Sequence, residues 1–340
     1  MRTFDDALPP ACPYVSCAFH RDPPREFWRP AGRYRTRGYP GGLRRFRCLS
    51  CFRTFSIRRF SVEFRLHKPE CTEAALFHFV SSVSLRQAAR SGKHHLCRQS
   101  LERRLLRFGL HGQRLLRRSA RLLSLSGDFY LDEAESFETS RLKYPLTIPI
   151  LVHGKSRFTL SAHVDSLPAR ASVRKRYPDL PRRPNHSNFV VSRALERFVR
   201  VAEAGSVLKT DRKPSYRSLL RGLDPERKIT HQRFSSTIRR DQWNPIWVIN
   251  HTLAMQRDGC SRLRRRTWCH AKRALQLWAH LGVYYAWKNF VRPRFNGDQE
   301  CPAQIVKLTD RRWGETELVR WRLDLGKASI VSLPDRRHAA

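Results

Sequence analysis

The chain has 340 residues, of which 67 are Lys or Arg and 29 are Asp or Glu, and its formal net charge at pH 7 is +38. This surplus indicates a polyanionic partner. Nucleic acid fits better than a lipid surface, because basic residues recur from Arg21 to Arg337 and do not gather on one amphipathic helix. A biased genome composition would explain frequent arginine but not the scarcity of acids. With 40% hydrophobic residues the chain can bury real cores, which excludes wholesale disorder.

No segment of the sequence predicts a membrane span or a signal peptide. The longest mainly apolar stretch, Pro145 to Val152, is far shorter than the ~20 residues of a bilayer helix. We therefore expect a cytoplasmic, nucleoid-associated protein with two or three domains. In that compartment thiols stay reduced, so the nine cysteines are expected to be metal ligands or buried thiols before disulfides.

Residues 1–60 are rich in Pro, Gly, Arg and Cys and lack a helical period, which predicts a small metal-stapled module, a zinc ribbon. Cys12 and Cys17 form one close pair, and Cys48 and Cys51 form a second with Cys-x2-Cys spacing. Four thiolates complete a tetrahedral structural zinc site without an open position for water. The alternative is four unconnected buried thiols, although so small and polar a segment hardly folds without a bound metal ion or another cross-link.

Two further stretches predict contacts with DNA. Within the first module Arg44, Arg45 and Arg47 are interleaved with aromatic residues, a composition suited to phosphate contacts. Residues 61–126 have apolar residues at helical spacing, which predicts a helix-turn-helix region. Its second helix would begin with Arg98, Gln99 and Ser100. Two short amphipathic helices around a glycine also occur in α-helical domains that touch no DNA.

Residues 127–292 predict a mixed α/β sheet with antiparallel hairpins on one side, followed by a C-terminal tail with a short helix at 293–340. The predicted elements in chain order are strands at 129–137, 146–152 and 158–164, a helix at 189–204, a strand at 207–210, a helix from about Ser215, a strand at 229–234, and helices at 247–266 and 268–291.

The placement of the rare acids within this region is informative. Asp132 lies inside the first strand, where a charge costs desolvation unless something compensates it. Asp211 ends a later strand. If the two strands are neighbours, two carboxylates converge at one end of the sheet, an arrangement that raises a pKa or holds a divalent cation. For Asp211 the common alternative is a cap on the following helix.

Several motifs, in this order, resemble bacterial insertion-sequence transposases with a zinc ribbon, a helix-turn-helix and a catalytic domain of the ribonuclease-H-like fold. The motifs that carry the resemblance are Leu131–Glu138, Pro145–Val152, Leu208–Tyr216, Asn250–Arg257 and Arg262–Cys269, with Lys272 and His280-Leu281. The resemblance covers nearly the whole chain. It implies that Asp132 and Asp211 are the first two members of an Asp-Asp-Glu triad that binds magnesium. It also implies double-stranded DNA as the partner and a homo-oligomer on that DNA. Further DNA contacts are assigned to Arg264, Arg265 and Arg266.

The third acid of the triad is where the sequence departs from this family. The Glu of the similar proteins falls on Leu275, eight residues after Thr267. Asp258 lies 17 residues earlier, about 25 Å away along a continuous helix. Glu133 and Glu135 point to the strand face opposite Asp132, because side chains alternate. Gln276 projects about 100° round the helix from Leu275.

Two functions therefore stay open from the sequence. The first is a transposase that binds element ends and cuts and joins DNA with magnesium at Asp132 and Asp211. The second is a decayed or repurposed DNA-binding protein derived from such an enzyme, because Leu275 is no ligand for a hard cation.

Overall fold

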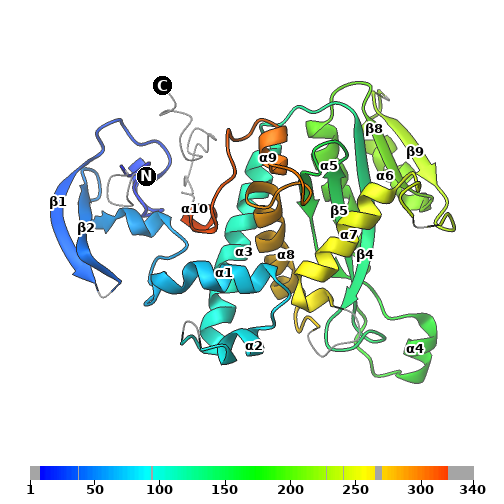
Figure 1. The fold of residues 1–340 in the computed structure, drawn as a ribbon, viewed down its shortest axis with the longest axis horizontal. Coiled ribbons are helices and arrows are strands. Elements are labelled where there is room, and N and C mark those ends of the chain that lie inside the picture. The colour runs from blue at the N-terminus through cyan, green and yellow to red at the C-terminus, as the bar shows by residue number, and fades with distance from the viewer. Residues whose placement is uncertain are drawn as a thin grey trace. The chain divides into compact units, whose positions relative to one another are not determined.

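The computed structural model describes residues 8–36, 38–92, 95–226, 228–239, 241–264 and 270–320 (Figure 1). They form two compact units. The first holds the described residues up to Ala74 and from Gly314 onward, and the second runs from Ala75 to Trp313. Arg265 and Arg266, two of the predicted DNA contacts, lie outside the described residues. No helix of the described ranges is long and apolar enough to cross a membrane.

The first unit is built on a three-stranded antiparallel sheet in the order β1-β2-β3. Its elements are β1 (Trp28–Thr36), β2 (Tyr39–Cys48), β3 (Thr54–Ser56), the short helices Ala18–His20, Ile57–Phe60 and Pro69–Cys71, the start of α1 (Thr72–Val80), and α10 (Glu315–Arg320). The core is small and aromatic. The ring centroid of Phe55 lies 6.0 to 6.5 Å from the ring centroids of Phe27, Phe46 and Phe60. Three of the four predicted zinc ligands are buried in the same cluster.

The second unit contains a sheet in the order β6-β5-β4-β8-β9, with β7 paired to β5. Its strands are β4 (Asp128–Phe137), β5 (Pro145–His153), β6 (Thr159–Ala162), β7 (Asp165–Ser166), β8 (Val207–Asp211) and β9 (Thr230–Phe234). The first three are antiparallel neighbours, whereas β8 and β9 are parallel to β4. This order and these directions are those of the ribonuclease-H-like fold, so the predicted fold class is confirmed.

Helices cover both faces of this sheet, which explains why β5 is buried from Leu146 to His153 and reads as a continuous apolar run. Phe129 packs against Phe198 of α5, while Asp132 lies beside α7 in a shared cavity. Because odd and even positions of a strand face opposite sides, α5 and α7 lie on opposite faces (Figure 1). The helices are α1 (Thr72–Val80), α2 (Leu85–Arg90), α3 (Arg98–Ala120), α4 (Ala171–Arg176), α5 (Ser187–Val201), α6 (Pro214–Leu223), α7 (Trp247–Gly259), α8 (Ala274–Phe290) and α9 (Pro302–Ile305).

Helices α3 and α8 cross at unusually close range. A Cβ added to Gly109 would come 2.3 Å from the backbone oxygen of Ala279, and one added to Gly282 would come 2.4 Å from the oxygen of Gly109. Only glycine permits this approach. The helix predicted to read DNA is therefore also one of the central packing elements of the second unit.

The predicted elements are confirmed in type, and the largest difference concerns α7. The sequence predicts a helix to Arg266, but α7 ends at Gly259 and a short 3-10 turn follows at Ser261–Leu263. Gly259 lies against Tyr284, where an added Cβ would meet the ring at 2.3 Å. The close approach of α8 thus marks the end of α7. Helix α8 begins at Ala274, and residues 265–269 of the predicted helices lie outside the described ranges.

Candidate functional site

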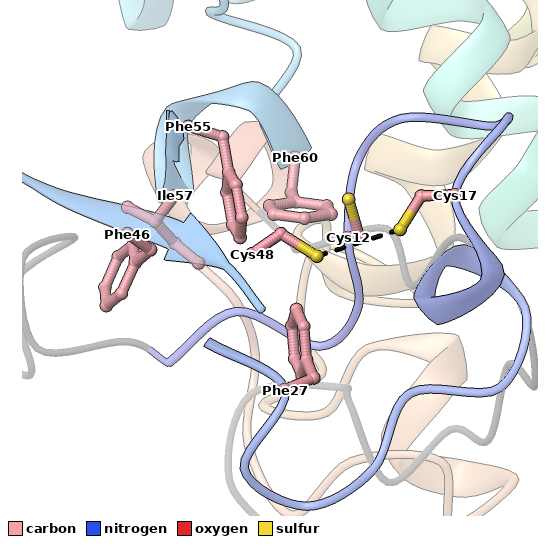
Figure 2. Packing of buried hydrophobic residues seen from close by; sticks show 8 residues of the cluster. All are labelled: Cys12, Cys17, Phe27, Phe46, Cys48, Phe55, Ile57 and Phe60. Carbon is pink, nitrogen blue, oxygen red and sulfur yellow. Dashed lines mark hydrogen bonds between the residues drawn. The ribbon is translucent and has the colours of Figure 1, made fainter. Parts of the chain in front are cut away.

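The four cysteines of the first unit come together. Their sulfur atoms all lie within 4.8 Å of one another. The Sγ atoms of Cys12 and Cys51 are 3.7 Å apart, as are those of Cys17 and Cys48. Figure 2 shows Cys12, Cys17 and Cys48 facing one another beside the aromatic core. The short Cys48-Cys51 turn follows β2, and the other pair comes from the loop before the first 3-10 helix.

The spacing of these sulfurs fits a structural zinc ion. Four sulfurs at ~2.3 Å from a tetrahedral zinc lie about 3.8 Å apart, close to the two measured separations. Burial works against ionisation of Cys17, but hydrogen bonds from Ser50, the Phe19 backbone and two neighbouring thiols outweigh it and lower its pKa to about 7. A thiolate is the form that binds metal. In contrast, burial raises the pKa of Cys12.

The two predicted acids of the second unit lie on neighbouring strands. Strands β4 and β8 pair in parallel up to Tyr130 and Lys209, and Asp132 and Asp211 follow two residues later on each strand. Asp132 accepts a hydrogen bond from the backbone N–H of Glu133 at 2.7 Å. Asp211 accepts one from the N–H of Lys213 at 3.0 Å. This last bond closes an Asx turn at the strand end, which fixes the direction of the Asp211 side chain.

Both acids line one large cavity of about 1450 Å³. Its wall is formed by residues of β4 and the end of β8, by the residues after β9, by one side of α7, and by residues between the end of α1 and the residue after α2. Among its lining residues are Gln87, Ser91, Ser235, Asn244, Trp247, Asn250, His251, Asp258 and Arg264. Gln87 belongs to α2, so a helix of the predicted helix-turn-helix borders the acid pair within the same unit.

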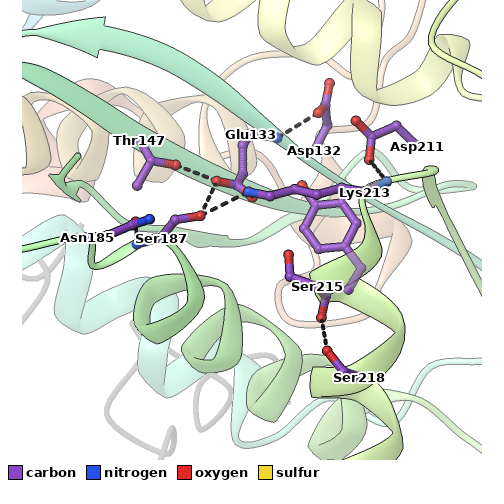
Figure 3. A network of polar contacts seen from close by, with 10 residues as sticks. Asp132, Glu133, Thr147, Asn185, Ser187, Asp211, Lys213, Ser215 and Ser218 are labelled. Carbon is purple, nitrogen blue, oxygen red and sulfur yellow. Dashed lines mark hydrogen bonds and ion pairs between the residues drawn. The ribbon is translucent and has the colours of Figure 1, made fainter. Parts of the chain in front are cut away.

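On the opposite face of β4, Glu133 is the centre of a polar network that the sequence did not reveal (Figure 3). Its Oε1 accepts hydrogen bonds from Lys213 Nζ at 2.5 Å and from the Tyr216 hydroxyl at 3.0 Å. Its Oε2 accepts from Thr147 at 2.6 Å and from Ser187 at 2.9 Å. Four donors occupy this carboxylate, so Glu133 is engaged as a structural anchor.

This network ties the turn after β8 to β4. Lys213 stands two residues after Asp211, and Glu133 is the neighbour of Asp132. The Lys213–Glu133 ion pair, with only 10% of the Glu133 side chain exposed, therefore holds together the two segments that carry the acids. Burial raises the pKa of Tyr216, and the charges of Glu133, Asp132 and Asp211 add to this shift. The hydroxyl thus stays protonated and donates to Glu133.

The structure places position 275 away from the cavity wall. Leu275 is the second residue of α8, is 57% exposed and does not line the cavity. Gln276 donates its side-chain amide to Glu102 of α3. The backbone N–H of Ala274 instead donates to Glu138, whose carboxylate also pairs with Arg183 at 2.8 Å. A carboxylate near a helix N-terminus is stabilised by the helix dipole.

Asp258 lines the acid-lined cavity, although the sequence does not predict it there. Its distance of about 25 Å from position 275 applies only along one continuous helix, and α7 and α8 are separate helices. Asp258 lies on the cavity side of α7, one helix turn beyond Ala254. Among the described residues, however, the four cysteines are the only group of three or more His, Cys, Asp or Glu side chains that lie close enough together to hold a metal ion.

The predicted DNA contacts fall in separate places. Arg44, Arg45 and Arg47 lie on β2, and Arg44 and Arg47 stand opposite Arg33 and Arg29 of β1. Like charges in opposite positions destabilise a sheet unless an anion compensates them. In the second unit, Arg98, Gln99 and Ser100 form the first turn of α3, and Arg98 and Gln99 are exposed. Arg264 lines the acid-lined cavity.

Comparisons with known proteins add little to this geometry. No protein-family model matches the chain, and no curated protein matches it. Among solved structures the chain is similar to the catalytic core domain of BIV integrase, at 13% sequence identity and a TM-score of 0.29. The match covers 54% of this chain and 94% of that one. The strand order β6-β5-β4-β8-β9 and the strand directions given above identify the ribonuclease-H-like fold.

Proposed function

We propose that the protein is a DNA transposase of an insertion sequence, which binds the ends of its element and cuts and joins DNA with the help of divalent metal. The observation that carries the proposal is the position of Asp132 and Asp211 on neighbouring strands of a ribonuclease-H-like sheet, in the wall of one large cavity. The resemblance of the sequence motifs to bacterial insertion-sequence transposases supports the same function.

Asp132 and Asp211 would hold magnesium, because hard cations take carboxylate oxygens as ligands. Bound magnesium supplies activation of a water or hydroxyl and stabilisation of the leaving oxygen during in-line attack on phosphorus. The chain itself contributes the fixed positions of the two carboxylates. The backbone N–H groups of Glu133 and Lys213 orient them, and the Glu133 network holds their strands together.

The proposed partner is double-stranded DNA, bound by a homo-oligomer in the nucleoid. The charge of +38 supports a polyanionic partner. We assign residues 1–60 to a zinc ribbon, 61–126 to recognition of element ends, 127–292 to catalysis and 293–340 to a C-terminal tail. In this division the zinc ion is structural, since four cysteines leave it no open position.

A second function is favoured by one observation. Leu275 stands where the similar transposases have their third acid, and its side chain is apolar and lies outside the cavity wall. A protein with only two metal-binding carboxylates would bind magnesium weakly. This observation supports a DNA-binding protein that derives from a transposase and has lost its strand-cutting activity.

A nicking assay on a duplex that carries the inverted repeats flanking the gene separates the two functions. We expect magnesium-dependent nicking by the wild type, loss of nicking in Asp132→Asn and in Asp211→Asn, and retention in Asp128→Asn. Asp128 is the matched control, because it lies on the same strand but pairs with Lys209 at 2.7 Å. A wild type that binds the duplex without nicking it contradicts the transposase. Nicking gained by Leu275→Glu would then identify a decayed enzyme.

A further inference from the structure

Four basic side chains gather at the N-terminal end of α7, apart from the acids already described. We call them the Lys288 cluster; its members are Arg157, His251, Lys288 and Arg292. Lys288 lies near the end of α8 and is only 9% exposed. Its Nζ donates to the backbone oxygen of Arg157 at 3.2 Å. A carbonyl oxygen satisfies one of the three ammonium donors and supplies no opposite charge.

The cluster has no acidic counterpart among the residues that the structure describes. The nearby acids are engaged elsewhere, since Asp298 pairs with Arg294 at 2.6 Å and Asp128 pairs with Lys209. Burial, together with the charges of Arg157 and Arg292, lowers the pKa of Lys288 to about 7. Burial also lowers the pKa of His251, with the same three cations contributing. A buried charge without a partner of opposite charge is costly, so buried charges in proteins are normally paired.

Arg157 is held in a geometry that suits an anion. Its guanidinium lies 4.9 Å from the ring of Trp247 and 5.4 Å from the ring of Phe295. Cation–π contacts of this kind hold the guanidinium in place without using its N–H donors. Within the described chain the Nη1 atom is buried and lacks a hydrogen-bond partner. A buried donor without a partner points to an unseen water or ion.

The backbone of Arg157 adds to this argument. Its φ angle is 60°, in the left-handed region that a side chain adopts only at an energetic cost. Glycine would occupy this turn more easily. Replacement of Arg157 by glycine is therefore expected to preserve this turn.

The Lys288 cluster borders the acid-lined cavity. His251 and Trp247 both line that cavity, and their rings stack at 4.9 Å. The same Trp247 ring contacts the Arg157 guanidinium. His251 is thus the member of the cluster that lines the cavity holding Asp132 and Asp211, and Arg157 contacts the cavity wall through Trp247.

We propose that the Lys288 cluster binds a phosphate group, with the edge of Arg157 as its main donor and His251 and Arg292 beside it. Guanidinium groups bind phosphate oxygens through two parallel N–H bonds, and Lys288 adds to the attraction below pH 7, where it is protonated. We assign this phosphate to a phosphodiester of the DNA strand that lies in the acid-lined cavity, and this assignment rests on the proposed function. The acids would then meet one phosphate of the strand while the cluster holds another.

Melting curves in inorganic phosphate and in chloride at equal ionic strength test the site without DNA. We expect phosphate to raise the melting temperature of the wild type by about 2–4 °C relative to chloride. Below pH 7, where Lys288 is protonated, Lys288→Met should melt higher than the wild type in chloride, because a buried charge disappears, yet lose the phosphate increment. A merely structural lysine predicts the opposite in chloride, and a variant that keeps the phosphate increment would overturn the proposal.

Two further variants make this test secure. Arg157→Gly removes the guanidinium while relaxing the left-handed backbone, so it should fold and also lose the phosphate increment. Lys175→Met removes an exposed cation from α4 and should keep the increment, because its charge belongs to no buried cluster. An equal loss in Lys175→Met would mean that phosphate only screens the net charge, which overturns the site.

Binding of a duplex oligonucleotide at fixed salt tests the strand assignment. We expect Arg157→Gly to weaken affinity about tenfold, and Lys175→Met less than about twofold. Phosphate binding without any effect of Arg157→Gly on DNA affinity would overturn the assignment to the strand and leave free phosphate as the ligand. Absence of magnesium-dependent nicking with both cluster effects intact would count against the transposase function, not against the cluster.

Discussion

The cysteine site of the first unit and the acid-lined cavity of the second differ in how their residues are brought together. The cysteines form two pairs that are close in sequence, and they are part of the small core itself. Asp132, Asp211 and Asp258 come from three distant segments, and a sheet with its own buried apolar core carries the first two. Zinc bound to the four cysteines would therefore contribute to the folding free energy of the first unit. In the second, metal would bind to a scaffold that folds without it.

The largest effect is therefore expected at the cysteines. Apparent binding free energies of about 10–16 kcal/mol for zinc in zinc-finger peptides indicate that this module needs its metal to fold. We expect Cys48→Ser/Cys51→Ser, or treatment with a chelator, to unfold the β1-β2-β3 sheet while the second unit stays folded. Zinc analysis together with amide hydrogen exchange measures both parts. Cys71→Ser is the matched control, since Cys71 lies in the same unit outside the cluster. One zinc per chain in the double variant would contradict the site.

The Glu133 network should give the next largest effect. Removing one partner of a buried ion pair costs about 3–5 kcal/mol, because the other charge is left uncompensated. We expect Lys213→Met to lower the free energy of unfolding by about that amount, reduced somewhat by the 36% exposure of the Lys213 side chain. The double variant Lys213→Met/Glu133→Gln should recover part of the loss. Denaturant unfolding of the two single variants and the double variant measures the coupling, and strict additivity would show that the pair does not act as a unit.

Smaller effects are expected from the two sets of proposed DNA contacts, one on the β2 strand and one at the start of the α3 helix. Replacing Arg44, Arg45 and Arg47 by Ala should weaken binding to all sequences and reduce the slope of log affinity against log salt by about 0.9 per lost phosphate contact. Replacing Arg98 and Gln99 by Ala should instead cost about 1–3 kcal/mol of sequence discrimination. Titrations with specific and scrambled duplexes at several salt concentrations distinguish the two. Equal behaviour of both sets would remove the recognition role of α3.

Features that depend on residues close in sequence could be predicted, whereas features that depend on contacts between distant segments could not. The cysteine cluster is predictable from the sequence, because pairs of cysteines at short spacing need one turn each to converge. The strands of the second unit are readable because β-branched and apolar residues alternate or run together. Asp132 stood out as an acid inside a strand pattern, and Asp211 as an acid at a strand end.

What the sequence could not predict depends on tertiary contacts. Glu133 was assigned correctly to the face opposite Asp132, but its partners Lys213 and Ser187 come from two other segments. A second acid in a strand of so basic a chain was the available signal. The position of Asp258 in the cavity depends on the end of α7 at Gly259, which the approach of Tyr284 imposes. No local periodicity encodes that approach.

Melting curves with and without magnesium test whether Asp132 and Asp211 jointly bind a divalent cation. We expect magnesium to raise the melting temperature of the wild type, because it relieves the repulsion of two neighbouring carboxylates. Asp132→Asn and Asp211→Asn should abolish that increment while the apo protein stays equally or more stable. Asp128→Asn should lower the apo stability, through loss of its pair with Lys209, and keep the increment. A wild type whose melting temperature does not respond to magnesium or manganese would contradict the metal site.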